Sequence, residues 1–145
     1  MKAKTTSPGF FLRIFLLLYS TLNFLSANPN LSLNANGIHL NNSTDLVITN
    51  NAISLAGDYG IYSPHSPNSL IDNNSISGSF DGVYMTDCSH CVFVSNEIES
   101  ERHGIVSRSS ESPIFESNVI DIYSESNVAS RGIYNTESTN TYIGD

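Results

Sequence analysis

A glycine followed at once by isoleucine or valine recurs five times along this chain, and an asparagine lies fourteen residues after each of the first four glycines. The glycines are 23, 22, 22 and 28 residues apart. The pairs are Gly37 and Asn51, Gly60 and Asn74, Gly82 and Asn96, and Gly104 and Asn118, with Gly132 as a fifth start. A unit of this length cannot bury an apolar face alone, so the repeat predicts a solenoid in which successive units stack.

Aligning the repeats on their glycines places apolar residues at three fixed distances. The first column is Ile38, Ile61, Val83, Ile105 and Ile133; the second is Val47-Ile48, Leu70-Ile71, Val92-Phe93, Ile114-Phe115 and Tyr142-Ile143; the third is Ile53, Ile76, Ile98 and Ile120. Short β-branched runs are separated by Asn, Ser and Gly, and no helical periodicity is present. The sequence therefore predicts an all-β chain made of short strands.

The stretches GIHLNNSTDLVITNNAIS and GIYSPHSPNSLIDNNSIS resemble the repeats of right-handed parallel β-helix proteins in the NosD-like and pectate-lyase-like superfamily. The resemblance covers residues 37–145 and implies a right-handed parallel β-helix of about four to five coils, with three strands in each coil. In such a fold, like residues stack from coil to coil. Asn51, Asn74, Asn96 and Asn118 are then expected to form a structural ladder, because side-chain amides donate and accept hydrogen bonds at bends.

The first 27 residues lie outside the repeat and have the features of a secretory signal peptide. Basic residues come first, an apolar run at residues 14–18 follows, and the small residues Ser26-Ala27 close the segment. We expect a short leader at 28–36 and the repeats at 37–145. The apolar run is too short and too interrupted to be a membrane anchor, and no stable membrane span is expected after signal removal. The product is expected to be secreted, periplasmic or displayed on the cell surface.

Residues 28–145 contain three arginines and all 14 acidic residues, which gives a net charge of −11. Such a surface repels phosphate backbones, so nucleic-acid binding is not expected. Arg102, Arg108 and Arg131 all lie in the last two repeats, and the fourth repeat contains an insertion between Ile120 and Gly132. Insertions in solenoids commonly contact partners, although a solvated loop is the simpler alternative.

The fifth repeat reaches Asp145, one residue before its expected asparagine. We therefore expect an open C-terminal edge and an incomplete set of repeats. An uncovered parallel edge favours edge-to-edge self-association or pairing with a partner.

Three tyrosines recur at the position two residues after the glycine, namely Tyr62, Tyr84 and Tyr134, with His39 and Val106 in the other repeats. Because the flanking positions are predicted to face the core, this position faces solvent. Tyrosine rings with polar tips offer a platform for sugar rings, so this column is the predicted ligand-binding surface. The alternative is that tyrosine simply suits exposed strand positions.

The position just before each glycine is the most varied, and it includes Asp81, His103 and Arg131. On successive coils these would offer an acid, a base and a cation, which a polysaccharide lyase, epimerase or hydrolase requires. The two facing carboxylates of a typical glycoside hydrolase are missing from the pattern. These three residues are therefore candidates for catalysis in an alternative hypothesis.

Cys88 and Cys91 are separated by two residues, with His90 between them. In an exported chain such a pair commonly closes a local disulfide, whereas inert thiols and a soft-metal site are the alternatives. A metal would need about four well-placed ligands, so no metal or other cofactor is expected. The resemblance to NosD-like proteins keeps a metal-associated role as an alternative. Our first hypothesis is an exported, non-catalytic scaffold that recognises carbohydrate or a protein partner.

Overall fold

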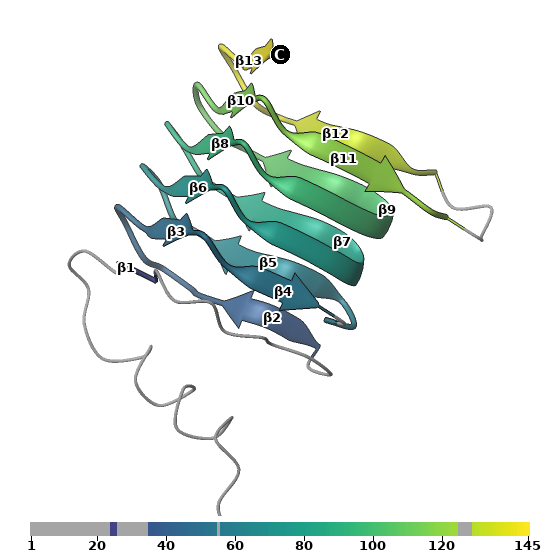
Figure 1. Ribbon diagram of the computed structural model, residues 1–145. Coiled ribbons are helices and arrows are strands. Elements are labelled where there is room, and N and C mark those ends of the chain that lie inside the picture. Colours follow the sequence, from purple (N-terminus) through teal and green to yellow (C-terminus); the bar gives the residue numbers. More distant parts are fainter. Residues whose placement is uncertain (1–23, 26–34, 55, 125–128) are drawn as a thin grey trace, which may run out of the picture.

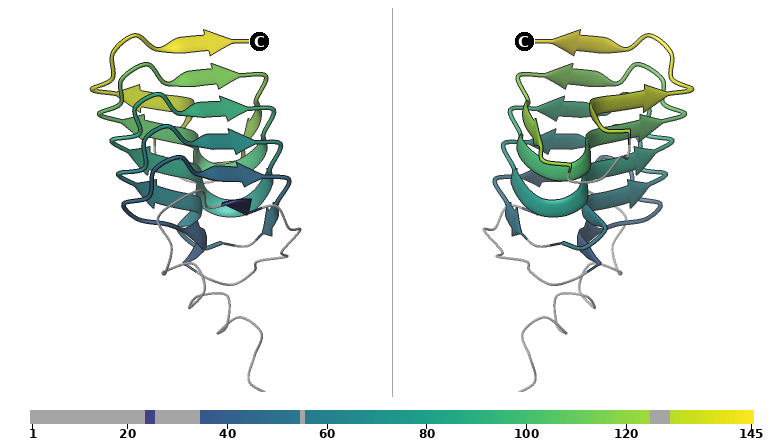
Figure 2. Two further views of the ribbon diagram at one scale, coloured as in Figure 1. Left: turned by 90° about the vertical axis from the view of Figure 1, so that its left-hand side faces the viewer. Right: turned by 90° about the vertical axis from the view of Figure 1, so that its right-hand side faces the viewer.

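The chain forms a stack of coils in which each coil lies directly above the one before it (Figures 1 and 2). This computed structural model describes residues 24–25, 35–54, 56–124 and 129–145. Every strand pairing in the described residues is parallel. The all-β class and the β-solenoid architecture predicted from the glycine repeat are therefore confirmed.

The strands fall into two sheets. The first has the order β1-β3-β6-β8-β10-β13, and the second has the order β11-β9-β7-β5-β2, with β12 beside β9 and β4 beside β7. The bounds are β1 (Phe24–Leu25), β2 (Asn36–His39), β3 (Val47–Thr49), β4 (Ala52–Ser54), β5 (Tyr59–Pro64), β6 (Leu70–Asp72), β7 (Ser75–Thr86), β8 (Val92–Val94), β9 (Glu97–Arg108), β10 (Ile114–Glu116), β11 (Val119–Ile122), β12 (Arg131–Thr136) and β13 (Tyr142–Gly144).

Two coils differ from the expected three separate strands. β7 and β9 each run for 12 residues and contain both the third strand of one coil and the first strand of the next. Their pairing shifts register on either side of Ser79, which marks a β-bulge. A bulge bends a strand without ending it, and Figure 1 shows both strands curving around this corner.

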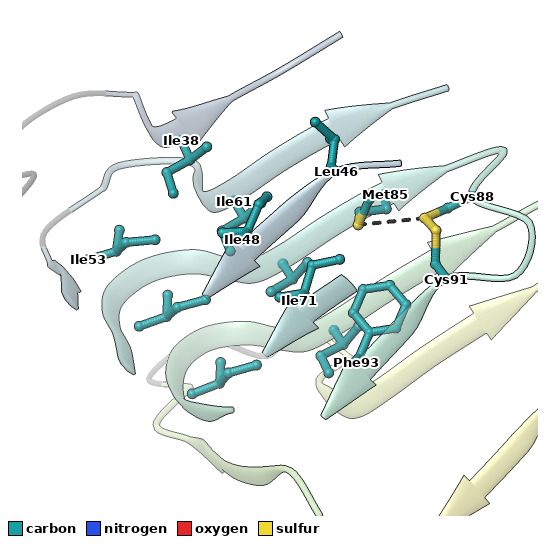
Figure 3. Close-up of a cluster of buried hydrophobic side chains, with 14 of the residues drawn as sticks. Ile38, Leu46, Ile48, Ile53, Ile61, Ile71, Met85, Cys88, Cys91 and Phe93 are labelled. Carbon is teal, nitrogen blue, oxygen red and sulfur yellow. Dashed lines mark hydrogen bonds between the residues drawn. A yellow bond between two sulfur atoms is a disulfide. The ribbon is translucent and has the colours of Figure 1, made fainter. Parts of the chain in front are cut away.

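The core is formed by inward-facing members of the three predicted apolar columns (Figure 3), whereas Tyr142 and Ile143 of the last coil are exposed. Ile61 and Val83 pair in register from the first column, as do Ile71 and Phe93 from the second. All four are 0% exposed. Phe93 and Phe115 stack with ring centroids 4.9 Å apart. Because parallel pairing stacks equivalent positions, one apolar residue per coil at each column produces a continuous core.

The four asparagines form a continuous ladder. The backbone N–H and the side-chain Nδ2 of Asn74 both donate to Oδ1 of Asn96, each at 3.0 Å. Asn51 makes the same two bonds to Asn74, and Asn96 makes them to Asn118. Nδ2 of Asn96 also donates to the carbonyl of Ile71 at 2.9 Å. The ladder therefore ties each bend to the coils on either side.

Each coil bends at residues with left-handed backbone conformation, at five, eight and thirteen residues after the glycine. These residues are Asn42, His65, Asp87, Ser109 and Glu137; Asp45, Asn68, His90, Ser112 and Asn140; and Asn50, Asn73, Ser95 and Ser117, with φ between 49° and 58°. Asn and Asp tolerate this conformation better than most residues. The abundance of Asn at the bends thus serves the backbone as well as the ladder.

The predicted signal peptide and leader lie largely outside the described residues. The exceptions are β1, in which Phe24 pairs with Val47 and Leu25 pairs with Ile48, and residues 35–36 of the leader, where β2 begins at Asn36. Cleavage after Ala27 would remove β1 from the first sheet. In the part of the chain that the structure describes, no helix has the length and hydropathy needed to cross a bilayer.

β13 is the last described strand of the first sheet. β13 pairs only with β10 among the described strands and forms the last rung in Figure 2. The exposed large apolar side chains gather on this coil and the strand before it; they are Val119, Tyr123, Tyr142 and Ile143. Edge-to-edge self-association stays a prediction.

Candidate recognition face

The column two residues after the glycine continues across β2, β5, β7, β9 and β12. His39 pairs with Tyr62, and Tyr62 pairs with Tyr84 in the same register. Their ring centroids are 5.0 Å apart for the first pair and 5.7 Å for the second. The predicted binding tyrosines of these two coils therefore lie side by side on the outer face.

Tyr59 joins this group from the position before its glycine. Its ring is stacked on Tyr62 with centroids 5.0 Å apart and an interplanar angle of 20°, and it lies 5.0 Å from the ring of Tyr84. The three tyrosines are half-buried and His39 is exposed. We call His39, Tyr59, Tyr62 and Tyr84 the aromatic face.

The expectation that the whole column faces solvent is wrong at Val106, which is 0% exposed. Arg108 follows two residues later on β9 and projects on the same side of the strand. Its guanidinium Cζ lies 5.7 Å from the ring centroid of Tyr84 and 5.4 Å from that of Tyr134. In the coil where Val106 replaces tyrosine, the Arg108 side chain therefore lies between the rings of Tyr84 and Tyr134 and contacts both.

Tyr134 differs from the other predicted binding tyrosines because polar groups already surround its ring. The His103 ring lies 5.1 Å from the Tyr134 ring, and the Arg131 Cζ lies 4.5 Å from it. Together with Arg108, two guanidinium groups contact one ring. We call Arg108, Arg131, His103 and Tyr134 the cationic end of the face.

The structure stacks the three candidate catalytic residues, since Asp81 pairs with His103 and His103 pairs with Arg131. Their side chains nevertheless have other partners. The Asp81 carboxylate is 0% exposed and accepts hydrogen bonds from Nε and Nη2 of Arg102 and from the backbone N–H of His103. The cation that neutralises Asp81 is therefore Arg102 and not Arg131. The Arg102 Cζ also lies 4.4 Å from the Phe80 ring centroid.

Two titratable groups beside the Asp81 carboxylate, His103 and Tyr59, have shifted pKa values. Burial lowers the pKa of His103, and Arg102, Arg131 and Arg108 lower it further, against an opposing effect of Asp81. Nδ1 of His103 accepts a hydrogen bond from the Arg131 backbone N–H at 3.1 Å, so the neutral ring carries its hydrogen on Nε2. Burial, and next the Asp81 carboxylate, raise the pKa of Tyr59, which keeps its phenol neutral. A buried, paired carboxylate and a bonded imidazole make a poor acid and base.

The structure joins Cys88 and Cys91 in a disulfide inside the turn between β7 and β8. Both residues are 0% exposed. Sδ of Met85 lies 3.7 Å from Sγ of Cys88 (Figure 3). The backbone N–H of Ser69 donates to Sγ of Cys91. Within the described residues, no three His, Cys, Asp or Glu side chains are placed to hold a metal ion.

Sequence reasoning missed the roles of Tyr59, Phe80 and Arg102 and the position of Arg108 over the column. Tyr59 lies at the varied position before its glycine, outside the predicted tyrosine column, and the repeat alone does not indicate that its ring stacks on Tyr62. The insertion of the fourth repeat begins with Tyr123, which is 41% exposed, and residues 125–128 lie outside the described residues.

The sequence model of one protein family, described as the right handed beta helix region, matches residues 18–145 of this chain. The chain belongs to this family. The matched range begins before β1, so it includes this strand, which pairs with β3 in the first sheet. Neither the comparison with curated proteins nor that with solved structures returned a match.

Proposed function

We propose that this β-helix is an exported, non-catalytic recognition domain that binds carbohydrate through the aromatic face. The observation that carries the proposal is the contact of four ring side chains on three successive coils, with neighbouring centroids 5.0 to 5.7 Å apart. Half-exposed tyrosines bury apolar ring area against a sugar and keep a hydroxyl for hydrogen bonding. The parallel sheet beneath fixes the spacing of the rings before any ligand binds, which reduces the entropy lost on binding.

The alternative hypothesis, a polysaccharide lyase, epimerase or hydrolase, has weaker support than carbohydrate recognition. Its candidate acid, Asp81, is neutralised by Arg102, and its candidate base, His103, has a lowered pKa and accepts a backbone hydrogen bond. Export rests on the order of basic, apolar and small residues at the N-terminus. The buried disulfide fits an oxidising compartment.

A binding measurement with tyrosine variants tests the proposal. The full chain would be titrated by calorimetry with neutral oligosaccharides, alongside Tyr62→Ala and Tyr84→Ala. Tyr142→Ala is a matched control, because Tyr142 is 54% exposed on β13 in the other sheet. We expect each face variant to weaken binding by about tenfold, and Tyr142→Ala to bind normally.

Tyr62→Phe and Tyr84→Phe keep the rings and separate stacking from loss of the hydroxyl. They are expected to bind nearly as well as the unaltered chain. Equal weakening by Tyr142→Ala, or undiminished binding after both face substitutions, would contradict the proposal. Binding of a protein partner to the same face, with no saccharide bound, would favour protein recognition instead.

A further inference from the structure

We propose that Asn42, at the outer corner of the first coil, is an acceptor for an N-linked glycan. This modification requires the sequence Asn-x-Ser/Thr, a sequon, and the chain contains four, beginning at Asn30, Asn41, Asn42 and Asn73. Asn30 lies outside the described residues. The inference rests on the export in the proposed function and does not depend on carbohydrate recognition.

The reaction is a group transfer from an oligosaccharide linked to a polyprenyl diphosphate. A bond forms between Nδ2 of Asn42 and the anomeric carbon of the first sugar, and the bond from that carbon to the diphosphate oxygen breaks. The diphosphate carrier leaves with the bonding electron pair, and the amide gives one proton to a base of the transferring enzyme. No oxidant or reductant is required. The chain has only to present an accessible Nδ2 and the hydroxyl of its sequon.

Asn42 meets this condition in the turn between β2 and β3. Its side chain is exposed, and its backbone is left-handed with a φ of 51°. The backbone N–H of Asn42 donates to the Pro64 carbonyl at 3.1 Å, which fixes the turn to the next coil. Its side-chain amide has no hydrogen-bond partner among the described residues. The fold therefore holds the backbone and leaves Nδ2 accessible.

The neighbouring coil does not engage Asn42 either. His65 lies at the equivalent position of the next coil, and its Nδ1 lies 2.8 Å from Oδ2 of Asp87 on the coil beyond, so the ring is held toward Asp87. The residues at this position of the coils are all exposed; they are Asn42, His65, Asp87, Ser109 and Glu137. A glycan at this corner would project into solvent and displace no core contact.

Asn73 is exposed as well, but its amide is engaged. Nδ2 of Asn73 donates to Oδ1 of Asn50 at 2.6 Å. Asn74, the middle residue of this sequon, is 1% exposed and belongs to the asparagine ladder. A sugar on Nδ2 of Asn73 would compete with the bond to Asn50, so the folded chain disfavours this acceptor.

Asn41 and Asn42 differ in the hydroxyl that completes their sequons. Asn41 requires Ser43, whose Oγ donates to the Asn41 carbonyl at 3.3 Å. Asn42 requires Thr44, which is exposed and whose hydroxyl has no hydrogen-bond partner among the described residues. The accessible hydroxyl of Thr44 therefore favours Asn42 over Asn41.

The test is production of the full chain in a eukaryotic cell line that N-glycosylates secreted proteins. Cells and medium are both collected, and the chain is analysed by mass spectrometry before and after treatment with a peptide-N-glycosidase. This treatment leaves aspartate at each modified asparagine, so fragmentation of the chain locates the site. The variants are Asn42→Gln and Thr44→Ala. Ser43→Ala is the matched control, because it removes the neighbouring hydroxyl and keeps the sequon of Asn42.

We expect a glycan at Asn42 of the unaltered chain. Asn42→Gln and Thr44→Ala should lose this glycan, whereas Ser43→Ala should keep it. Thr44→Ser, which retains a hydroxyl at the third position of the sequon, should also keep it. Thermal unfolding of each variant after removal of any glycan establishes that it is folded.

A secreted chain without a glycan would overturn this inference and leave the proposed export standing. A glycan at Asn30, Asn41 or Asn73 in place of Asn42 would also overturn it, as would a glycan at Asn42 that persists in Thr44→Ala. A chain that is neither secreted nor glycosylated would overturn the proposed export as well.

Discussion

Ile98 occupies the space that a side chain at Gly82 would need: a Cβ on Gly82 would lie 2.3 Å from Cγ2 of Ile98. It would also lie 2.6 Å from the carbonyl oxygen of Gly104 in the next coil. The same contacts recur at Gly37, Gly60 and Gly104. The glycine column therefore exists because the third apolar column and the neighbouring backbone approach it closely.

Gly82→Ala should destabilise the fold by about 2 kcal/mol or more, because neither the buried isoleucine nor the backbone can move aside easily. Gly132→Ala is the control, since its Cβ would lie 3.9 Å from the nearest side-chain atom, Cγ2 of Ile120. Urea unfolding measures both. Equal stability of the two variants would contradict the packing argument.

Asn96→Ala should cost about 1–3 kcal/mol, because it removes the side-chain acceptor of the buried Asn74 backbone N–H and one of the acceptors of Asn74 Nδ2. Asn41→Ala, at an exposed position outside the ladder, should stay within about 0.5 kcal/mol of the unaltered chain. Chemical denaturation of both variants checks the prediction. A small effect at Asn96 would show that the ladder adds little to stability.

Stability should fall as the pH is lowered from about 7 to about 5. The folded pKa of His103 lies below its ordinary value, so the unfolded chain binds the proton more tightly in this range. The contribution is complete above the unfolded pKa and is lost as the pH falls toward the folded pKa. His103→Gln, which keeps an acceptor for the Arg131 N–H, should reduce this pH dependence in thermal melts. An identical slope in the variant would show that His103 does not cause it.

Removing the disulfide should destabilise the chain by about 2 kcal/mol, since it closes only a short loop. The double variant Cys88→Ser with Cys91→Ser gives this turn the residues of the preceding coil, Ser66 and Ser69. Unfolding in reducing buffer should make the unaltered chain match the variant. Equal stability with and without reductant would mean that the disulfide is absent or without effect.

The glycine register predicted the fold well because parallel pairing places equivalent positions above one another. Ile61 and Val83 are adjacent in the core for this reason, and so are Tyr62 and Tyr84 on the outer face. What the register could not predict is where long side chains reach. Arg102 crosses from its own coil to Asp81, and Arg108 covers the coil of Val106, because side-chain torsions and not strand pairing decide these contacts.

The repeat pattern also did not predict that β7 and β9 continue without a break through a corner of the coil. The corner near Ser79 bends through a bulge, which keeps the chain extended where a separate turn was expected. The left-handed bends had a visible signal in the recurring Asn and Asp residues, but Ser, His and Glu occupy the same conformation at several of them. The path of the coil imposes the left-handed backbone conformation at those positions, so residue type alone does not predict it.

The most direct test of the recognition face is an NMR titration of the isotopically labelled chain with the oligosaccharide that binds most tightly. We expect chemical shifts to change at Tyr62, Tyr84 and their neighbours on β5 and β7, while β3, β6, β8 and β10 in the other sheet stay unchanged. Shift changes confined to that other sheet, or none with any oligosaccharide, would contradict carbohydrate recognition by the aromatic face.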